Sequence, residues 1–195
     1  MFLFNEDWFS YGGMECGLYG TAKGHKLKSL DGMATRPTAD KIKESLFNIL
    51  LPIISDTYVL DLFAGTGSIG IEALSRGAEF AVFIDKNPSA VKIIRENLIH
   101  TKLQDKSKIY NADYKKYINN IYDGERAFDI IFIDPPYNKG LIIPAMQLIG
   151  EKKLLSPDGL IVVEHGKEEN IPEQIGDFKA IRKQDYGRTI ITFYK

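Results

Sequence analysis

Five carboxylates stand at or just beyond the ends of apolar runs in this 195-residue chain. They are Asp61, Asp85, Asp113, Asp134 and Glu164. Ligands of an open parallel sheet bind beyond the carboxyl ends of its strands, so we expect these side chains to rim one crevice. Because like charges repel, such a rim disfavours an anionic ligand and suits one that is cationic or rich in hydroxyl groups.

The loop after the first apolar run is rich in glycine. Asp61 precedes Phe63-Ala64-Gly65-Thr66-Gly67, residues 65–70 have the spacing GxGxxG, and Asp85 stands twenty residues after Gly65. The same spacing binds dinucleotides, in which the distal acid takes the ribose hydroxyls. A pyrophosphate would lie badly beside the carboxylate of Asp61, whereas S-adenosylmethionine carries a sulfonium, an ammonium and no phosphate. The loop therefore favours S-adenosylmethionine as the cofactor and leaves a nicotinamide-dependent oxidoreductase as an alternative.

The segment Asp134-Pro135-Pro136-Tyr137 predicts a site for a planar amine. Two successive prolines make a rigid turn and remove two N–H donors, which leaves the carbonyl of Pro135 free. A carboxylate and a carbonyl that accept the two hydrogens of an exocyclic base amine turn its lone pair toward a methyl donor, while the tyrosine ring stacks on the base. We predict these four residues as the catalytic group. The alternative is a strand-end turn that carries a buried tyrosine.

An alternation of strands and helices must position these groups. Continuous apolar runs predict buried parallel strands at 58–63, 80–84, 108–110, 128–133 and 160–163. Helices are predicted from Thr38 to Pro52, over 68–76, and after Asn87, a cap followed by Pro88. Residues 178–195 predict an antiparallel hairpin, and the whole reads as one three-layer α/β domain.

Composition limits the compartment and the partners. Hydrophobic residues make up 44% of the chain and charged residues 26%, and no apolar run approaches the length of a membrane helix. A single cysteine, Cys16, and the lack of a secretory signal predict a cytoplasmic protein. No second His or Cys stands at ligand spacing, so we predict no metal site.

The net charge of −1 conceals two basic ends. Residues 21–48 carry six Lys/Arg against three Asp/Glu, and residues 178–195 carry five against one. Local density of basic residues determines affinity for nucleic acid more than the total does. We predict an RNA-binding surface formed by Lys23, His25, Lys26, Lys28, Arg36 and Arg188.

Several segments together resemble the RsmD family of 16S rRNA guanine-N2 methyltransferases, among the class I S-adenosylmethionine-dependent methyltransferases. The resemblance runs from about Gly17 to Lys195. It lies in Lys23-Gly24-His25-Lys26-Leu27, Thr35-Arg36-Pro37-Thr38, 43–48, 61–67, 71–77 and Asp134-Pro135-Pro136-Tyr137. Many methyltransferases share the glycine loop, but the joint occurrence of the arm, the helix entry and the proline turn is much more specific. His25 departs from the pattern, because such proteins often have arginine there.

The resemblance implies a Rossmann-like fold with a seven-stranded, mostly parallel sheet and an antiparallel C-terminal strand. It implies that Asp61, Gly65 and Gly67 line the methionine part of the cofactor, Asp85 takes the ribose hydroxyls and Asp113 lies beside the adenine amine. The cofactor-binding residues predicted in full are Asp61, Phe63, Ala64, Gly65, Thr66, Gly67, Asp85, Lys86, Ala112 and Asp113. Asp134, Pro135 and Tyr137 would hold the guanine.

The substrate implied is a guanine of 16S rRNA, of the guanine 966 type, methylated at N2 by direct transfer. The RNA would be free or part of a small-subunit assembly intermediate, and the enzyme a monomer. An adenine-N6 methyltransferase on DNA or RNA stays open, as do a glutamine-directed protein methyltransferase and an assembly factor without catalysis. Residues 1–13 are expected to be a tag or extended start, 14–37 a basic arm or hairpin, and 38–195 the methyltransferase domain. We expect His100 to be a surface residue and His165 to make a structural hydrogen bond.

Overall fold

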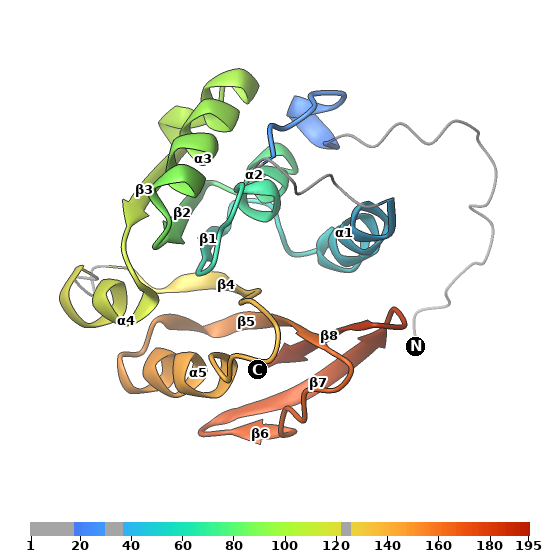
Figure 1. Cartoon of the computed structure of the whole chain (residues 1–195), viewed down its shortest axis with the longest axis vertical. Helices are drawn as coiled ribbons and strands as arrows, with labels where there is room; N and C mark the ends of the chain where they lie inside the picture. The colour runs from blue at the N-terminus through green and yellow to red at the C-terminus, as the bar shows by residue number, and fades with distance from the viewer. Residues whose placement is uncertain (1–17, 30–36, 122–125) are drawn as a thin grey trace.

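One mixed sheet organises the computed structural model, which describes residues 18–29, 37–121 and 126–195 (Figure 1). Within these ranges the sheet has eight strands in the order β3-β2-β1-β4-β5-β8-β7-β6. The parallel strands are β1 (Tyr58–Asp61), β2 (Phe80–Asp85), β3 (Ser107–Asn111), β4 (Phe128–Ile133) and β5 (Leu155–Gly166). Each of the five predicted apolar runs forms one of them, and β1 is the middle one of these five parallel strands, as in Rossmann-like folds.

The C-terminal part of the sheet is antiparallel. Strand β8 (Thr189–Tyr194) pairs antiparallel with β5 and with β7 (Phe178–Asp185), which confirms the predicted hairpin. The expected number of seven strands is wrong by one, because β6 (Gln174–Ile175) adds a short pairing to β7. Two residues are too few to show a strand period, so this strand leaves no pattern in the sequence.

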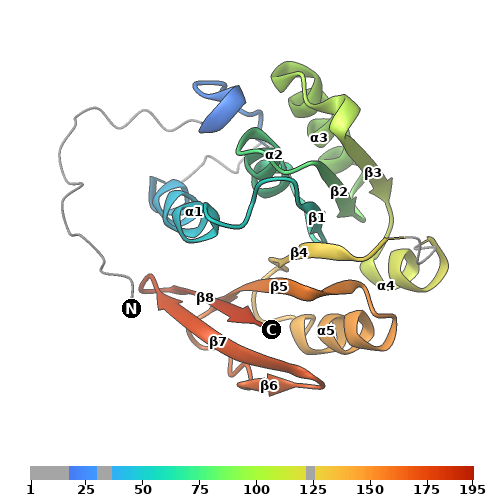
Figure 2. The same ribbon diagram turned by 180° about the vertical axis from the view of Figure 1, so that it is seen from behind.

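Helices cover both faces of the sheet (Figure 2). One layer holds α1 (Pro37–Leu50), α2 (Ser68–Ser75) and α3 (Pro88–Thr101), and the other holds α4 (Tyr114–Lys116) and α5 (Ile142–Glu151). Short helical turns complete the chain at η1 (Gly20–Ala22), η2 (Gln104–Lys106) and η3 (Tyr117–Ile121). Successive strand residues alternate between the two apolar cores: Val59 packs with the first layer and Leu60 with the second.

The helix boundaries follow their capping residues. Helix α3 starts as predicted, because the side chain of Asn87 accepts a hydrogen bond from Ser89 N at 3.0 Å and Pro88 holds the first position. Helix α2 starts after its N-cap residue Gly67, which has φ of +79°, a conformation that favours glycine. The turn between β1 and α2 is therefore tight, and it carries the glycine loop.

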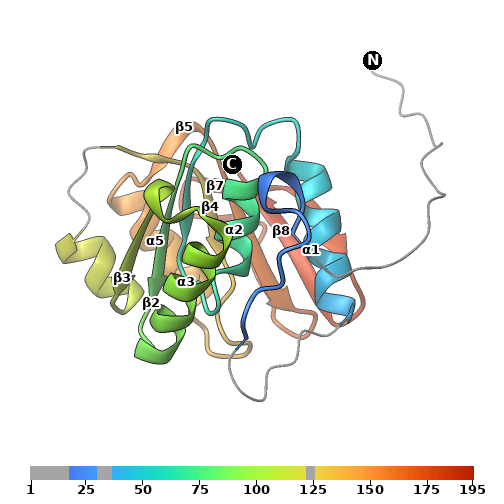
Figure 3. The same ribbon diagram turned by 90° about the horizontal axis from the view of Figure 1, so that it is seen from above.

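The described part of the N-terminal arm, residues 18–29, lies against α2 (Figure 3). Ser75 Oγ accepts a hydrogen bond from Ala22 N at 2.9 Å, and an added Cβ at Gly20 would lie 1.9 Å from the carbonyl oxygen of Ser75. This stretch contains one helical turn and no strand, so it has the form of an arm and not of a hairpin. The predicted tag at 1–13 and Arg36 fall outside the described residues. Over the described ranges, no helix is both long and apolar enough to cross a bilayer.

Candidate active site

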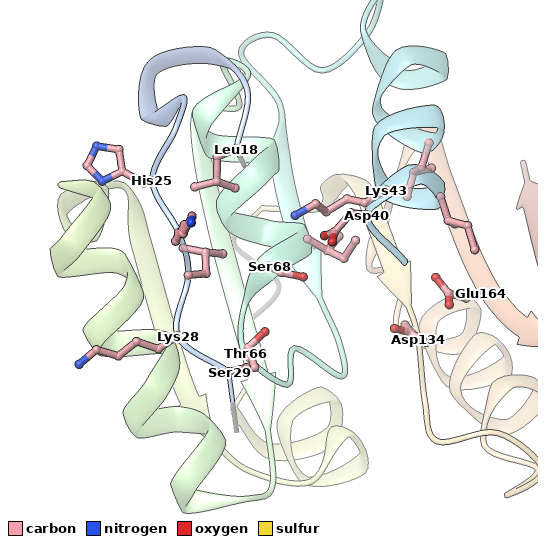
Figure 4. A pocket seen from close by; sticks show the side chains of 15 residues that line it. Leu18, His25, Lys28, Ser29, Asp40, Lys43, Thr66, Ser68, Asp134 and Glu164 are labelled. Carbon is pink, nitrogen blue, oxygen red and sulfur yellow. The ribbon is translucent and has the colours of Figure 1, made fainter. Parts of the chain in front are cut away.

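A cavity of 440 Å³ lies between the arm, α1 and the ends of β4 and β5 (Figure 4). Its walls carry Asp134 and Glu164 on one side and Thr66 and Ser68 of the glycine loop on another. The cavity thus joins the predicted cofactor loop to the predicted amine site. This agrees with the general position of ligands in open α/β sheets.

The glycine loop is held from β2. Gly65 N donates to Asp85 Oδ2 at 2.8 Å, and Asn87 N donates to Asp85 Oδ1 at 2.7 Å. An added Cβ at Gly67 would lie 3.3 Å from side-chain atoms of Ile94, so the backbone approaches α3 closely there. Asp85 therefore fixes the loop, and its remaining lone pairs are still able to accept from ribose hydroxyls.

Asp61 is a buried carboxylate beside this loop. One of its oxygens accepts a hydrogen bond from Gly70 N at 3.1 Å, and its side chain is 3% exposed. Burial, together with the charge of Asp85, raises the pKa of Asp61 to about 7, against the opposing effect of the Gly70 N–H. A cation next to this group would restore its charged form, which is what a sulfonium or an ammonium provides.

Asp134, Tyr137 and Glu164 form the second part of the site. The Tyr137 hydroxyl donates to Glu164 Oε1 at 2.8 Å and lies 3.1 Å from Thr189 Oγ1. Removal from bulk water raises the pKa of Asp134, and the charges of Glu164 and Asp61 raise it further. Burial also raises the pKa of Glu164, which the hydrogen bond from Tyr137 opposes. Asp134 keeps exposed surface and lines the cavity, so a ligand can reach it.

Four of the five predicted carboxylates are brought together. The charge of Asp85 contributes to the raised pKa of Asp61, and the charges of Glu164 and Asp61 contribute to the raised pKa of Asp134. Asp113 is exposed and caps α4, where Lys115 N donates to its Oδ1 at 2.9 Å. Of the remaining predicted cofactor residues, Phe63 is half-buried, Ala64 and Ala112 are buried, and Lys86 is exposed. In the proline turn, Pro135 is buried and Pro136 is exposed.

Two residues of α1 that were not predicted from the sequence also line the cavity. Asp40 and Lys43, three positions apart on the helix, both point into it (Figure 4). Their spacing places them on one helix face, which is the signal that could have found them. In Figure 4 the side chain of Lys43 extends from α1 toward α2, so α1 forms a further wall of the cavity.

Asn97 is a further residue that the sequence did not reveal. This fully buried side chain of α3 accepts from Lys28 N at 2.8 Å and donates to Lys28 O at 3.1 Å and to Thr66 O at 3.0 Å. One amide therefore ties the arm to the glycine loop. A buried asparagine among apolar helix residues is a visible signal, because such an amide needs partners.

Replacing Asn97 by alanine is expected to lower the free energy of unfolding by about 2–4 kcal/mol, since three hydrogen bonds are lost and backbone groups are left unpaired. Urea denaturation followed by circular dichroism measures this difference. Asn120→Ala, at an exposed position, serves as the control and should change little. A loss below about 0.5 kcal/mol in Asn97→Ala would contradict the role given to this amide.

The predicted RNA-binding residues are placed differently from one another. Lys23 and Lys26 are exposed, whereas Lys28 Nζ lies 2.8 Å from Glu96 Oε2 on α3. The ring of His25 contacts that of His100, with Nδ1 3.4 Å from Nε2. Arg188 lies in the turn between β7 and β8, beside a second cavity of 910 Å³ that also touches Tyr137 and Glu164.

His165 is buried on β5, next to Glu164. Its Nε2 lies 3.0 Å from Thr192 Oγ1 and its Nδ1 lies 3.1 Å from Gly166 O, and burial lowers its pKa. Both ring nitrogens are thus engaged within the fold. Across the described residues, no group of three or more His, Cys, Asp or Glu side chains could hold a metal ion.

The donor set of the site fits S-adenosylmethionine. Asp61 offers a buried carboxylate beside a loop whose glycines allow close backbone approach, and Asp134 and Glu164 add negative charge. A pyrophosphate would meet three carboxylates here, which disfavours a dinucleotide. The residues present therefore favour a cationic adenosine cofactor over a nicotinamide one.

Comparison with known proteins gives consistent matches over most of the chain. A family model with the description "Conserved hypothetical protein 95" matches residues 18–195. The Bacillus subtilis protein named "Putative rRNA methyltransferase YlbH" is 41% identical over 176 residues, covering 90% of this chain and 96% of that protein. The "Ribosomal RNA small subunit methyltransferase D" of Escherichia coli is 31% identical, covering 90% and 87% respectively.

A solved structure shows the same fold. The "Putative methyltransferase yhhF from Escherichia coli" superposes with a TM-score of 0.81 at 31% identity, covering 91% of this chain and 95% of that one. The overall fold is therefore shared with that structure over most of both chains.

Proposed function

Because the chain belongs to the RsmD family of methyltransferases, whose family model is "Conserved hypothetical protein 95", we propose that it methylates N2 of a guanine in 16S rRNA with S-adenosylmethionine as donor. The coarser activity, methylation of ribosomal RNA with S-adenosylmethionine, follows from the family. Membership of this family excludes the alternative of a nicotinamide-dependent oxidoreductase. That the base is a guanine, that the methylated atom is N2 and that the target is of the 966 type are what we propose beyond this activity.

One observation carries the proposal: Asp134 and Glu164 line a cavity together with the glycine loop, and the ring of Tyr137 is held beside them by its hydroxyl. An amine with two hydrogens needs acceptors, and a flat base needs a ring to stack on. Asp134 and Glu164 offer acceptors in the cavity next to the loop that would hold the cofactor, and Tyr137, which borders the neighbouring 910 Å³ cavity and donates to Glu164, offers the ring.

The residues of the chain would work by positioning and by accepting a proton. Bound S-adenosylmethionine supplies an electrophilic methyl group on a sulfonium. Asp134 and the carbonyl of Pro135 would accept the two amine hydrogens and so direct the nitrogen lone pair. The new N–C bond would form as the methyl–sulfur bond of the donor breaks and S-adenosylhomocysteine leaves as a neutral thioether. The nitrogen would give up one hydrogen as a proton, and Asp134, whose pKa is raised, would take it.

The RNA would be a small-subunit assembly intermediate or free 16S rRNA, and the target base would turn out of its stack to enter the cavity. We place the reaction in the cytoplasm and expect a monomer. Residues 14–37 would serve as the RNA-binding arm and residues 38–195 as the methyltransferase domain, while residues 1–13 would have no part in the chemistry.

The test is transfer of tritiated methyl groups to deproteinised and to protein-bound small-subunit RNA, followed by digestion and nucleoside analysis. N2-methylguanosine as the labelled nucleoside supports the proposal. N6-methyladenosine would favour the adenine alternative, and label on protein alone would favour the glutamine-directed one. If no methyl group is transferred to RNA or to protein, the remaining alternative is an assembly factor that lacks catalytic activity.

Reversing the charge of Lys26 is expected to weaken RNA binding. Lys26 is exposed and lines the cavity, and it forms no ion pair with any residue that the structure describes, whereas Lys28 pairs with Glu96. Lys26→Glu should lower the affinity for small-subunit RNA about tenfold and reduce the slope of log affinity against log salt by about 1. Filter binding across a salt series measures both.

The matched control is Lys152→Glu, an exposed position at the end of α5 on the opposite face of the sheet. It should leave both the affinity and the salt slope close to those of the unchanged protein. Equal behaviour of the two variants would refute the assignment of Lys26 to the RNA-binding surface.

A further inference from the structure

Glu164 has no task in the proposed transfer, although it lies beside the groups that do. It stands at the end of β5, lines the 440 Å³ cavity next to Asp134, and also borders the 910 Å³ cavity near Arg188. Its carboxylate and that of Asp134 lie on the same wall (Figure 4). Two carboxylates side by side are costly, because each charge opposes the other.

The two carboxylate oxygens of Glu164 differ in their hydrogen bonding. Oε1 accepts from the Tyr137 hydroxyl at 2.8 Å, and that hydroxyl is held from the other side by Thr189 Oγ1 at 3.1 Å. Over the described ranges, Oε2 has no hydrogen-bond partner, and the side chain is half-buried. A carboxylate oxygen in such a place calls for a donor, and a ligand in the cavity is the group that could bring one.

We infer that Glu164 selects guanine among the bases, by accepting the N1–H of the target base while Asp134 accepts from its N2 amine. This inference rests on the proposed function. The guanine edge places the N1–H donor directly beside the amine, so two neighbouring carboxylates match two neighbouring donors. The same side chain fixes the ring that stacks on the base, since Tyr137 bonds to Oε1.

The other bases do not offer this pattern. Adenine has an acceptor nitrogen on each side of its amine, N1 and N7, so in either orientation a lone pair would face Glu164. Cytosine has N3 as an acceptor on one side of its amine and a C–H on the other. A site whose polar group is left unpaired rejects an analogue much more strongly than a merely apolar pocket does. The proline turn accepts any exocyclic amine, so the choice of base requires a second residue.

The probe that isolates this contact is 2-aminopurine, which keeps the 2-amine and the purine ring but has an acceptor lone pair at N1. Small-subunit RNA is prepared by splinted ligation with 2-aminopurine at the guanine identified by the methyl-transfer experiment. The ratio of kcat/KM for guanine to that for 2-aminopurine is then measured for each variant. Comparison between variants cancels the intrinsic difference in reactivity of the two amines.

The unchanged protein should prefer guanine by about a hundredfold, the scale expected for one matched polar contact to a base. Glu164→Gln keeps an oxygen for the Tyr137 hydroxyl but turns an amide N–H₂ toward the base. This amide should donate to N1 of 2-aminopurine and oppose the N1–H of guanine, so the ratio should fall by about tenfold or more. The fluorescence of 2-aminopurine, which is quenched on stacking, provides a readout of base entry that needs no turnover.

Glu168→Gln is the matched control, because Glu168 borders only the neighbouring 910 Å³ cavity and loses the same charge. It should keep the hundredfold preference. Calorimetric titration with S-adenosylmethionine checks that each variant still binds the donor.

Two results would overturn the inference. The first is equal use of guanine and 2-aminopurine by the unchanged protein, which needs no variant and so does not depend on folding. The second is an unchanged ratio in Glu164→Gln, with or without an equal loss of activity on both bases, which would give Glu164 only a structural role. Absence of any transfer to ribosomal RNA would instead refute the proposed function itself, so the two failures are distinguishable.

Discussion

Replacing Asp134 by alanine is expected to lower kcat for methyl transfer by about a thousandfold, within the range for loss of a general base that also orients the nucleophile. The carboxylate lines the cavity, and its surroundings and neighbouring charges raise its pKa, which suits a proton acceptor. Without it, one amine hydrogen loses its acceptor and the lone pair is no longer directed. The affinity for S-adenosylmethionine, measured by calorimetry, should change far less than kcat.

Two further variants sharpen this test. Asp134→Asn keeps an oxygen that accepts a hydrogen bond but cannot take a proton, so it separates orientation from proton transfer. Asp158→Ala, at a fully exposed carboxylate, is the control and should keep full activity. Retention of a tenth or more of the activity by Asp134→Ala would remove Asp134 from the catalytic group.

Asp61→Asn is expected to stabilise the protein while it destroys donor binding. The carboxyl has a pKa of about 7 in the fold against 3.8 for the free group, because burial disfavours its charge. An asparagine can keep the hydrogen bond from Gly70 N without carrying that charge. We expect the free energy of unfolding at pH 7.5 to rise by about 2–4 kcal/mol and the affinity for S-adenosylmethionine to fall about a hundredfold or more.

The pH dependence gives this prediction a sign. Between pH 4 and 7 the folded protein holds the Asp61 proton and the unfolded chain has released it, so stability falls as the pH rises through this window and levels off above about pH 7. The variant lacks this contribution, so the two unfolding curves should coincide near pH 4 and separate toward pH 7. Urea denaturation over this range measures the difference, with Asp158→Asn as the control. Parallel curves at all pH values would contradict the assigned pKa.

Much of the fold could be predicted because its strands are buried on both faces. Continuous apolar runs at β1, β2 and β4 and the Asn87-Pro88 start of α3 are local signals, and the structure confirms them. The extra strand β6 was missed because its pairing with β7 involves only two residues. Its existence depends on a partner in the sheet and not on its own sequence.

The site was predictable only where one segment carries the whole pattern. The glycine loop and the proline turn each hold their residues within ten positions, and the βα alternation places both at one edge of the sheet. The contacts between Asn97 and Lys28 and between Tyr137 and Glu164 join residues far apart in the chain. The periodicity of apolar residues predicts only local structure, so contacts between residues far apart in the sequence become visible only in the folded structure.

The amide of Asn97 joins the glycine loop, which would hold the methyl donor, to the arm, which would bind the RNA. A ligand that immobilises Thr66 also restricts the backbone of Lys28, and so lowers the entropy that a second ligand must give up on this arm. Linkage is reciprocal, so any such cooperativity would be felt equally by the methyl donor and by the nucleic acid. The enzyme would then bind RNA most tightly while the methyl donor is bound, and release of one ligand would favour release of the other.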